Sequence, residues 1–246
     1  RQTRRAVREY HARRGTPPSG AGATDSMLTI YGRTNSANVQ KVLWCLAELG
    51  VTCERIDAGL AFGKNREPWY LALNPNGRIP LLVDGSFSLW ESNTIVRYLA
   101  SKHGRGTLCP ETPDARALAE RWMDWQLSTL VGPVSVVFQA LYRTPEAERM
   151  PATIASNTAE ANRAMLLLDA HLAEQPYVGG DSFTMGDIPV GATAYRWLEI
   201  IGIERPELPA VRAWRDRLAA RPAFRQHVML DRKSTRLNSS HVALSR

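Results

Sequence analysis

The stretch NPNGRIPLLVDGSFSLWESNTIVRYL, from Asn74 to Leu99, decides the fold of this chain. It predicts a strand that begins at Pro80, a tight turn at its DG pair, a second strand, and a helix that opens at Glu91-Ser92. A proline at the start of a strand donates no ladder hydrogen bond, and an X-Pro bond can be cis where the chain turns sharply. We therefore expect the backbone at Ile79 to pair with an extended peptide laid beside it.

The predicted helix start at Glu91-Ser92 has the features of a receptor for an amino-acid zwitterion. The N–H groups of a first helical turn are unpaired and carry positive dipole character, which suits a carboxylate. The Ser92 hydroxyl adds a donor, and the Glu91 carboxylate can hold an ammonium. With the backbone of Ile79, these groups predict a site for a small peptide that ends in a zwitterion.

The segments NPNGRIPLLVDG and ESNTIVRYLA resemble the glutathione-binding half of the cytosolic glutathione S-transferases, and the resemblance extends over residues 27 to about 230. It implies an α/β plus all-α protein, in which a thioredoxin-like N-terminal domain precedes an all-helical C-terminal bundle. The implied reaction is conjugation of the glutathione thiolate to small hydrophobic electrophiles. Glutathione would be a co-substrate, no cofactor or metal would be bound permanently, and the protein would be a homodimer.

The same resemblance assigns glutathione-binding residues. Ile79, Pro80, Glu91 and Ser92 are expected to hold the peptide. Lys64 and Arg78 are candidates for its glycyl carboxylate, although each is more often only a solvated charge.

Ser36 is the expected donor to the thiolate. A free thiol has a pKa near ~8.5, so the protein must stabilise the anion, and a hydroxyl beside a helix N-terminus can do so. Ser36 lies between the first predicted strand and helix, where the serine-type (phi- and theta-like) transferases carry their catalytic serine. The alternative is a simple N-cap. The runner-up donors are Tyr31, Asn35 and Asn38.

Apolar periodicity divides the chain into two domains. Residues 27–103 follow the order β-α-β, a short helix, and β-β-α, which implies a parallel pair and an added antiparallel hairpin. Residues 104–114 contain two Gly and two Pro and are expected to be a linker. Residues 115–230 carry helical patterns, and Pro133 is expected to kink or divide a long helix.

A capping box is predicted in the second domain. Thr184 fits an N-cap, and Asp187 sits three residues later, where its carboxylate can reach back to the N–H of the cap. We therefore interpret Asp187 as a structural residue that supports the helix Ile188–Ile200.

The net charge of +7 belongs to the two ends of the chain. Residues 1–26 hold six Arg and two acids, and residues 231–246 hold four basic groups and one acid. Removing these from the totals of 31 and 24 leaves 21 basic and 21 acidic residues, so the body has no electrostatic footprint for nucleic acid. We expect residues 1–26 to be a disordered or non-native extension and residues 231–246 to be a non-native tail.

The three cysteines show neither a CxxC pair nor a metal-ligand spacing. Cys45 lies on an apolar helix face and is expected to be buried, whereas Cys109, in the Pro-rich linker, is expected to be the most exposed thiol. No apolar run reaches the length of a membrane span. These observations predict a cytoplasmic protein that does not bind a membrane.

Three other functions stay open. A glutathione-dependent disulfide reductase or peroxidase would use the same pocket, and only substrate assays separate it from a transferase. A non-enzymatic, transferase-like module that binds proteins tends to lose the thiolate donor or the Glu-Ser pair, which this chain keeps. A maleylacetoacetate isomerase would carry a Ser-Ser-Cys start to the first helix, which is absent here.

Overall fold

The computed structural model describes residues 27–230, so the expectations for the two ends of the chain lie outside the described residues. Two compact units divide within helix α4 (Ser92–His103), because residues 27–99 belong to the first unit and Ala100–Met229 form the second. The division therefore falls inside the helix that was expected to close the first domain. Within the described range, no helix combines the length and the apolar character that crossing a bilayer requires.

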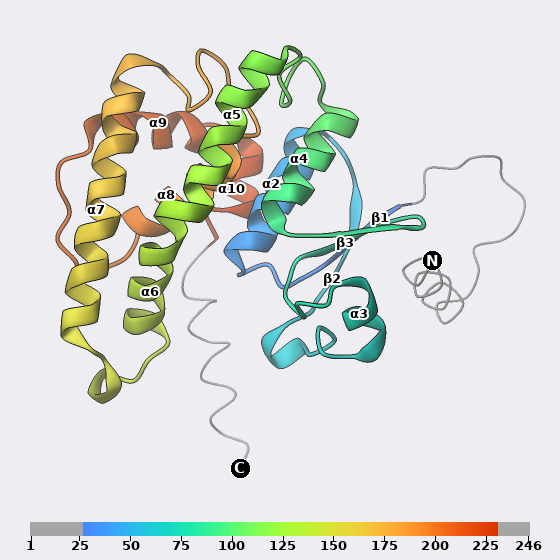
Figure 1. The fold of residues 1–246 in the computed structure, drawn as a ribbon, viewed down its shortest axis with the longest axis horizontal. Coiled ribbons are helices and arrows are strands. Elements are labelled where there is room, and N and C mark those ends of the chain that lie inside the picture. The colour runs from blue at the N-terminus through green and yellow to red at the C-terminus, as the bar shows by residue number, and fades with distance from the viewer. Residues whose placement is uncertain (1–26, 231–246) are drawn as a thin grey trace, which may run out of the picture. The chain divides into compact units, whose positions relative to one another are not determined.

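A four-stranded mixed sheet forms the centre of the first unit (Figure 1). Its order is β2-β1-β3-β4, with β1 parallel to β2 and antiparallel to β3, and β3 antiparallel to β4. This is the thioredoxin-like layout that the sequence predicts, so the expected fold class is confirmed. The strands are β1 (Leu28–Tyr31), β2 (Cys53–Ile56), β3 (Leu81–Asp84) and β4 (Phe87–Trp90).

Helices cover both faces of this sheet. The short helix α3 (Pro68–Leu73) packs Tyr70 and Leu73 against one face, where they join a buried cluster with Tyr31 and Leu81. Side chains alternate along a strand, so the neighbouring residue Ile30, which is fully buried, points to the opposite face. There α2 (Ala37–Glu48) and α4 lie together, on the side of the strands away from α3 (Figure 1).

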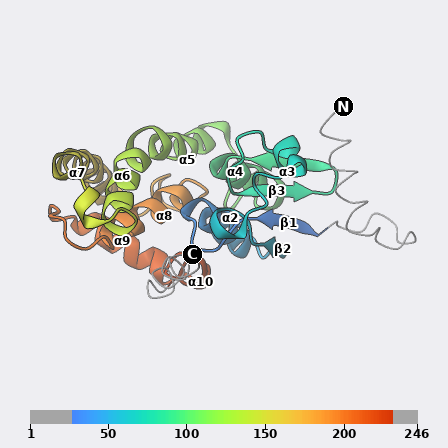
Figure 2. The same cartoon turned by 90° about the horizontal axis from the view of Figure 1, so that it is seen from below.

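The second unit is a helical bundle, as expected. Helix α8 runs through its interior, since every side chain from Asp187 to Ala194 is buried. Helices α6 and α7 lie side by side in both ribbon views (Figures 1 and 2). The helices are α5 (Pro113–Trp125), α6 (Val131–Tyr142), α7 (Pro151–Glu174), α8 (Asp187–Leu198), α9 (Pro209–Ala219) and α10 (Pro222–His227).

The junction between α5 and α6 is a π turn over Gln126–Leu130. The expected irregularity at Pro133 therefore begins several residues earlier, and Pro133 itself lies in the first turn of α6. A proline has no N–H for the preceding turn and its ring needs room there, so a widened turn ahead of it removes both conflicts. The buried side chain of Gln126 holds the turn by donating to the Thr193 hydroxyl at 2.9 Å.

The carboxylate of Asp187 organises the start of α8. Its Oδ2 accepts the Thr184 N–H at 2.9 Å, while its Oδ1 accepts the Val178 N–H and the Trp214 indole N–H, each at 3.0 Å. The helix begins at Asp187 with Gly186 in the N-cap position, so Thr184 lies two residues before the N-cap position that was expected for it. Burial raises the pKa of Asp187 to about 6.

The expectation for Cys109 is wrong. Its side chain is only 1% exposed, because the preceding residue Leu108 is buried and accepts the Met185 N–H at 2.8 Å, which docks this segment against the loop before α8. Cys45 is fully buried as expected, and that burial raises the pKa of its thiol. Cys53, which is half-buried, is the most exposed of the three thiols.

Candidate functional site

The sheet register brings three predicted site segments to one end of the sheet. Tyr31, at the end of β1, pairs with Leu81, at the start of β3, and Leu81 pairs in turn with Trp90, at the end of β4. The loop after β1, the segment before β3 and the turn after β4 must therefore leave the sheet at the same end. These segments carry Ser36, the Ile79-Pro80 bond and the Glu91-Ser92 pair.

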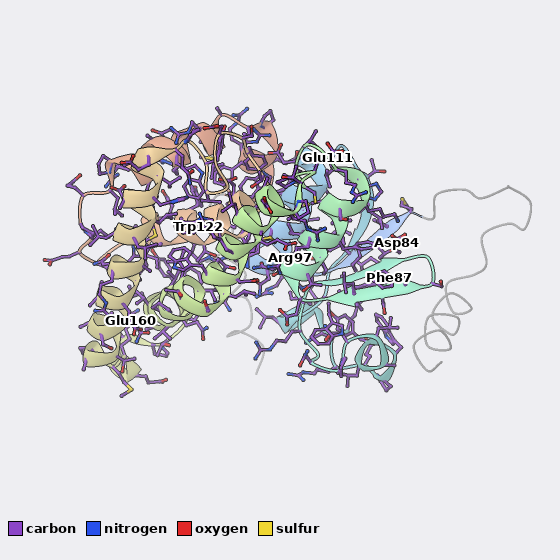
Figure 3. All side chains as sticks on the ribbon, turned by 45° about the horizontal axis from the view of Figure 1, so that its top comes forward. Asp84, Phe87, Arg97, Glu111, Trp122 and Glu160 are labelled. Carbon is purple, nitrogen blue, oxygen red and sulfur yellow. The ribbon has the colours of Figure 1, made fainter. Side chains whose placement is uncertain are left out.

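The opposite end of the hairpin is closed and tied to α4. Asp84 pairs with Phe87 across a two-residue loop, and both lie at the tip of the hairpin in Figure 3. The Tyr98 hydroxyl of α4 donates to Asp84 Oδ2 at 2.6 Å, and its ring lies 5.1 Å from that of Phe87. These contacts fix α4 against the hairpin, and so they also fix where the first turn of α4 begins.

The Ile79-Pro80 bond is cis. Pro80 is buried, whereas Ile79 is half-buried and packs at the margin of the cluster beneath α3. The preceding carbonyl, that of Arg78, accepts the Tyr70 hydroxyl at 2.6 Å and the Asn74 amide at 2.7 Å. These two hydrogen bonds therefore hold the loop that leads through Ile79-Pro80 into the start of β3.

Glu91 adopts a backbone conformation that is unusual for a residue with a side chain. Its φ is +72°, in the left-handed region, which costs a non-glycine residue about 1–3 kcal/mol unless its surroundings hold it there. Its carbonyl accepts the Ile95 N–H at 2.9 Å and so begins the helical pattern of α4. Glu91 is exposed, and the next residue, Ser92, is 4% exposed as the first residue of the helix.

Ser36 occupies the N-cap position of α2, but its hydroxyl does not cap the helix. Its carbonyl accepts the Gln40 N–H at 2.9 Å, and its φ and ψ of −88° and 122° are typical of an N-cap. Its side chain makes no hydrogen bond to the first turn of α2. The hydroxyl of this half-buried serine therefore remains available to an anion at the helix N-terminus.

The structure separates the runner-up donors from one another. Tyr31 is 2% exposed, and its ring packs 5.2 Å from that of Trp69 inside the cluster beneath α3. Asn35 is half-buried, and its Oδ1 has no hydrogen-bond partner among residues 27–230. Asn38 is exposed, and its Oδ1 accepts from Lys41 at 3.1 Å, so only its amide N–H groups can serve a ligand.

Lys64 and Arg78 differ in how they are held. Lys64 has a φ of +63° and donates its ammonium to the carbonyl of Asp57 at 3.1 Å, just after β2. Because β2 pairs with β1 through Ile56 and Tyr31, Lys64 lies toward the same end of the sheet as the other predicted residues. Arg78 is exposed next to the cis bond.

Sequence reasoning missed two residues at this end of the first unit. Lys41 is 1% exposed in α2, and its ammonium donates to Asn38 and to Asn93, the second residue of α4. The signal in the sequence was a lysine among the apolar positions of the first helix, and such a lysine is usually interpreted as a solvated charge. The described residues hold no cluster of three His, Cys, Asp or Glu side chains with the geometry of a metal site.

Comparison with known proteins identifies the family of this chain. The family model described as "Glutathione S-transferase, N-terminal domain" matches residues 26–101, and that described as "Glutathione S-transferase, C-terminal domain" matches residues 134–222. Glutathione S-transferase GstB of Escherichia coli K12 is 42% identical over 206 residues, which are 83% of this chain and 99% of that protein. Glutathione S-transferase 3 of Zea mays is 37% identical and covers 82% of this chain and 93% of its own.

Among solved structures, this chain is similar to the theta-class glutathione S-transferase of Xanthomonas axonopodis pv. citri with glutathione bound. The two are 50% identical, with a TM-score of 0.79 over 83% of this chain and 98% of that one. A glutathione S-transferase from Pseudomonas fluorescens is 28% identical, with a TM-score of 0.73.

Proposed function

Because this chain belongs to the glutathione S-transferase family, we propose that it conjugates the thiolate of glutathione to small hydrophobic electrophiles. The observation that carries the proposal is the common end of the sheet, where a serine hydroxyl that caps nothing lies on the same side as the cis-proline loop and the start of α4. A family member that had become a passive binding module would not need to keep all three.

In this proposal glutathione binds along the start of β3. The backbone of Ile79, next to the buried Pro80, pairs with the cysteinyl residue of the peptide. The γ-glutamyl carboxylate meets Ser92 and the N–H groups at the start of α4, while the exposed Glu91 carboxylate holds the ammonium. Lys64 and Arg78 supply positive charge for the glycyl carboxylate.

Ser36 then stabilises the thiolate. A hydrogen bond to a charged group is worth roughly 1.5–3 kcal/mol, which lowers a thiol pKa by about one to two units and makes the anion abundant at neutral pH. The reaction needs a thiolate because the neutral thiol is a weak nucleophile. Asn35 and Asn38 remain secondary donors in this proposal, and the buried ring of Tyr31 is the least favourable of the candidates.

The proposal also includes a homodimer located in the cytoplasm. Sedimentation velocity of the full chain tests the first part, and fractionation of the native host tests the second.

Activity assays test the proposal as a whole. The purified full chain is passed over immobilised glutathione, eluted with free glutathione, and then assayed with an aryl halide, a hydroperoxide and a mixed disulfide. Retention and fastest turnover of the aryl halide are expected. Retention with turnover of only the disulfide or hydroperoxide would transfer the assignment to a reductase or peroxidase, and failure to bind glutathione would overturn both.

A further inference from the structure

Lys41 is a buried lysine to which the proposed chemistry gives no task. It lies in the second turn of α2, in a run of buried residues that extends from Val39 to Leu46, and its side chain is 1% exposed. Removing an ammonium from water costs several kcal/mol, so a buried lysine persists only where its hydrogen bonds are well satisfied. Two asparagine side chains provide such bonds here.

The two acceptors come from two different helix starts. Lys41 Nζ donates to Asn38 Oδ1 at 3.1 Å, and Asn38 lies in the first turn of α2, two residues after Ser36. The same ammonium donates to Asn93 Oδ1 at 3.2 Å, and Asn93 follows Ser92 in the first turn of α4. Asn93 is 1% exposed, so this second bond is entirely buried.

The bonds therefore connect the two backbone segments that the glutathione site depends on. The thiolate donor sits at the N-terminus of α2 and the carboxylate receptor at the N-terminus of α4, and these segments are separated by more than fifty residues in sequence. Each first turn has N–H groups without partners in the helix, so nothing in helix geometry fixes one turn relative to the other. A buried ammonium bonded to both can do this.

We infer that Lys41 is a positioning residue of the glutathione site, which holds the first turn of α4 at the place where it receives the γ-glutamyl carboxylate and keeps it in register with the first turn of α2. This role rests on the proposed function. Lys41 does not touch the reacting atoms. It acts through Asn93 on the adjacent Ser92, and through Asn38 on the turn that bears Ser36.

The test compares Lys41→Met and Asn93→Ala, singly and together, with Lys102→Met as the matched control. Met keeps the length of the lysine stem without the ammonium, and Lys102 is an exposed lysine in the last turn of α4. Dissociation constants are measured by calorimetry for glutathione and for glutathione amidated at the γ-glutamyl α-carboxylate. The thermal midpoint of each variant is recorded alongside.

Lys41→Met is expected to weaken glutathione binding about threefold to tenfold, while binding of the amidated peptide changes less than twofold. A general loosening of the fold would weaken both ligands equally. Asn93→Ala should have a similar effect, and the double variant should be no worse than Lys41→Met alone, because Lys41→Met already removes the bond to Asn93. Lys102→Met should bind as the wild type does.

Several results would overturn the inference. Unchanged glutathione affinity in Lys41→Met, an equal loss for both ligands, or additive effects in the double variant would each do so while the wild type still binds glutathione. Should Lys41→Met fail to fold, Asn93→Ala, which keeps the lysine, must by itself show the loss specific to the carboxylate. A wild type that does not bind glutathione would instead overturn the proposed function itself.

Discussion

Glu91 and Ser92 are consecutive residues with opposite exposure, since Glu91 is exposed and Ser92 is 4% exposed. Glu91 has a left-handed backbone conformation, with φ at +72°, and the change from exposed to buried occurs there, at the point where α4 begins. In the proposed glutathione site, the outer carboxylate and the inner hydroxyl at the helix N-terminus are the two complementary halves of a receptor for a zwitterion. The strain at Glu91 is consistent with such a use, because strained residues concentrate at functional sites.

The left-handed backbone conformation of Glu91 can be tested by comparing the variants Glu91→Gly and Glu91→Ala. Glu91→Gly should be more stable than Glu91→Ala by about 1 kcal/mol, because glycine accepts a positive φ without strain. Elsewhere in a folded chain the order is usually the reverse. Both variants lose the ammonium partner, so both should bind glutathione more weakly than the wild type. Urea denaturation and calorimetry supply the two measurements, and an alanine variant as stable as the glycine variant would contradict this reading of the turn.

Gly32 controls the approach of α2 to the end of β1. A Cβ at Gly32 would lie 2.4 Å from Cγ2 of Val39, which is fully buried, so Gly32→Ala should lower the free energy of unfolding by about 1–3 kcal/mol. It should also reduce turnover, since the shifted segment carries Ser36. The control is Gly32→Ala combined with Val39→Ala, which should be more stable than the sum of the single effects. Strict additivity would show that the clash is not the cause.

Asp187 should make stability depend on pH in a specific direction. Burial raises its pKa from 3.8 to about 6 in the folded protein, so the protonated carboxyl is the form that folding favours. Its contribution is complete below about pH 4 and is lost as the pH rises through about 6. The stability advantage of the wild type over Asp187→Asn should therefore shrink between pH 4 and pH 7, by at most about 3 kcal/mol.

Denaturant unfolding of both proteins at several pH values measures this difference in stability. The contributions of groups that titrate equally in the two proteins cancel in the comparison. An advantage that grows with pH would mean that the N–H donors of Val178, Thr184 and Trp214 outweigh burial and favour the ionised carboxylate.

The thiols should react in an order set by burial. Cys53 is half-buried, whereas Cys45 and Cys109 are buried, so limited alkylation of the folded protein should modify Cys53 first. Cys45 and Cys109 should react only after denaturant is added. Peptide mass spectrometry after a short treatment with iodoacetamide identifies the sites. Prior modification of Cys109 would show that its segment leaves the loop before α8 in solution.

Local signals in the sequence were enough to predict much of the first unit. The Ile79-Pro80 pair, the DG turn and the apolar spacing of α2 each depend on neighbours within a few residues, and the structure has the corresponding loop, hairpin and helix. The short helix predicted between the two halves of this domain is also present, as α3. Local geometry of this kind is encoded where it occurs.

Features that depend on distant partners could not be predicted in the same way. Cys109 is buried because its segment bonds to Met185, which is far along the chain. The buried ammonium of Lys41 donates a hydrogen bond to Asn93 on another helix, and no residue within one helical turn of Lys41 predicts this contact. The missing cap bond of Ser36 is also invisible in sequence, since serine at an N-cap usually does bond to the first turn.

The central claim is that the Ser36 hydroxyl stabilises the glutathione thiolate, and the most direct measurement is the ultraviolet absorbance of the bound thiolate against pH. In Ser36→Ala the thiol pKa should rise by about one to two units and turnover at neutral pH should fall accordingly, while glutathione affinity changes little. Tyr31→Phe, the matched removal of a buried hydroxyl, should shift the pKa much less. A large shift in Tyr31→Phe with none in Ser36→Ala would contradict the account and make the chain tyrosine-type. No shift in either would contradict it as well and would direct attention to Asn35 and Asn38.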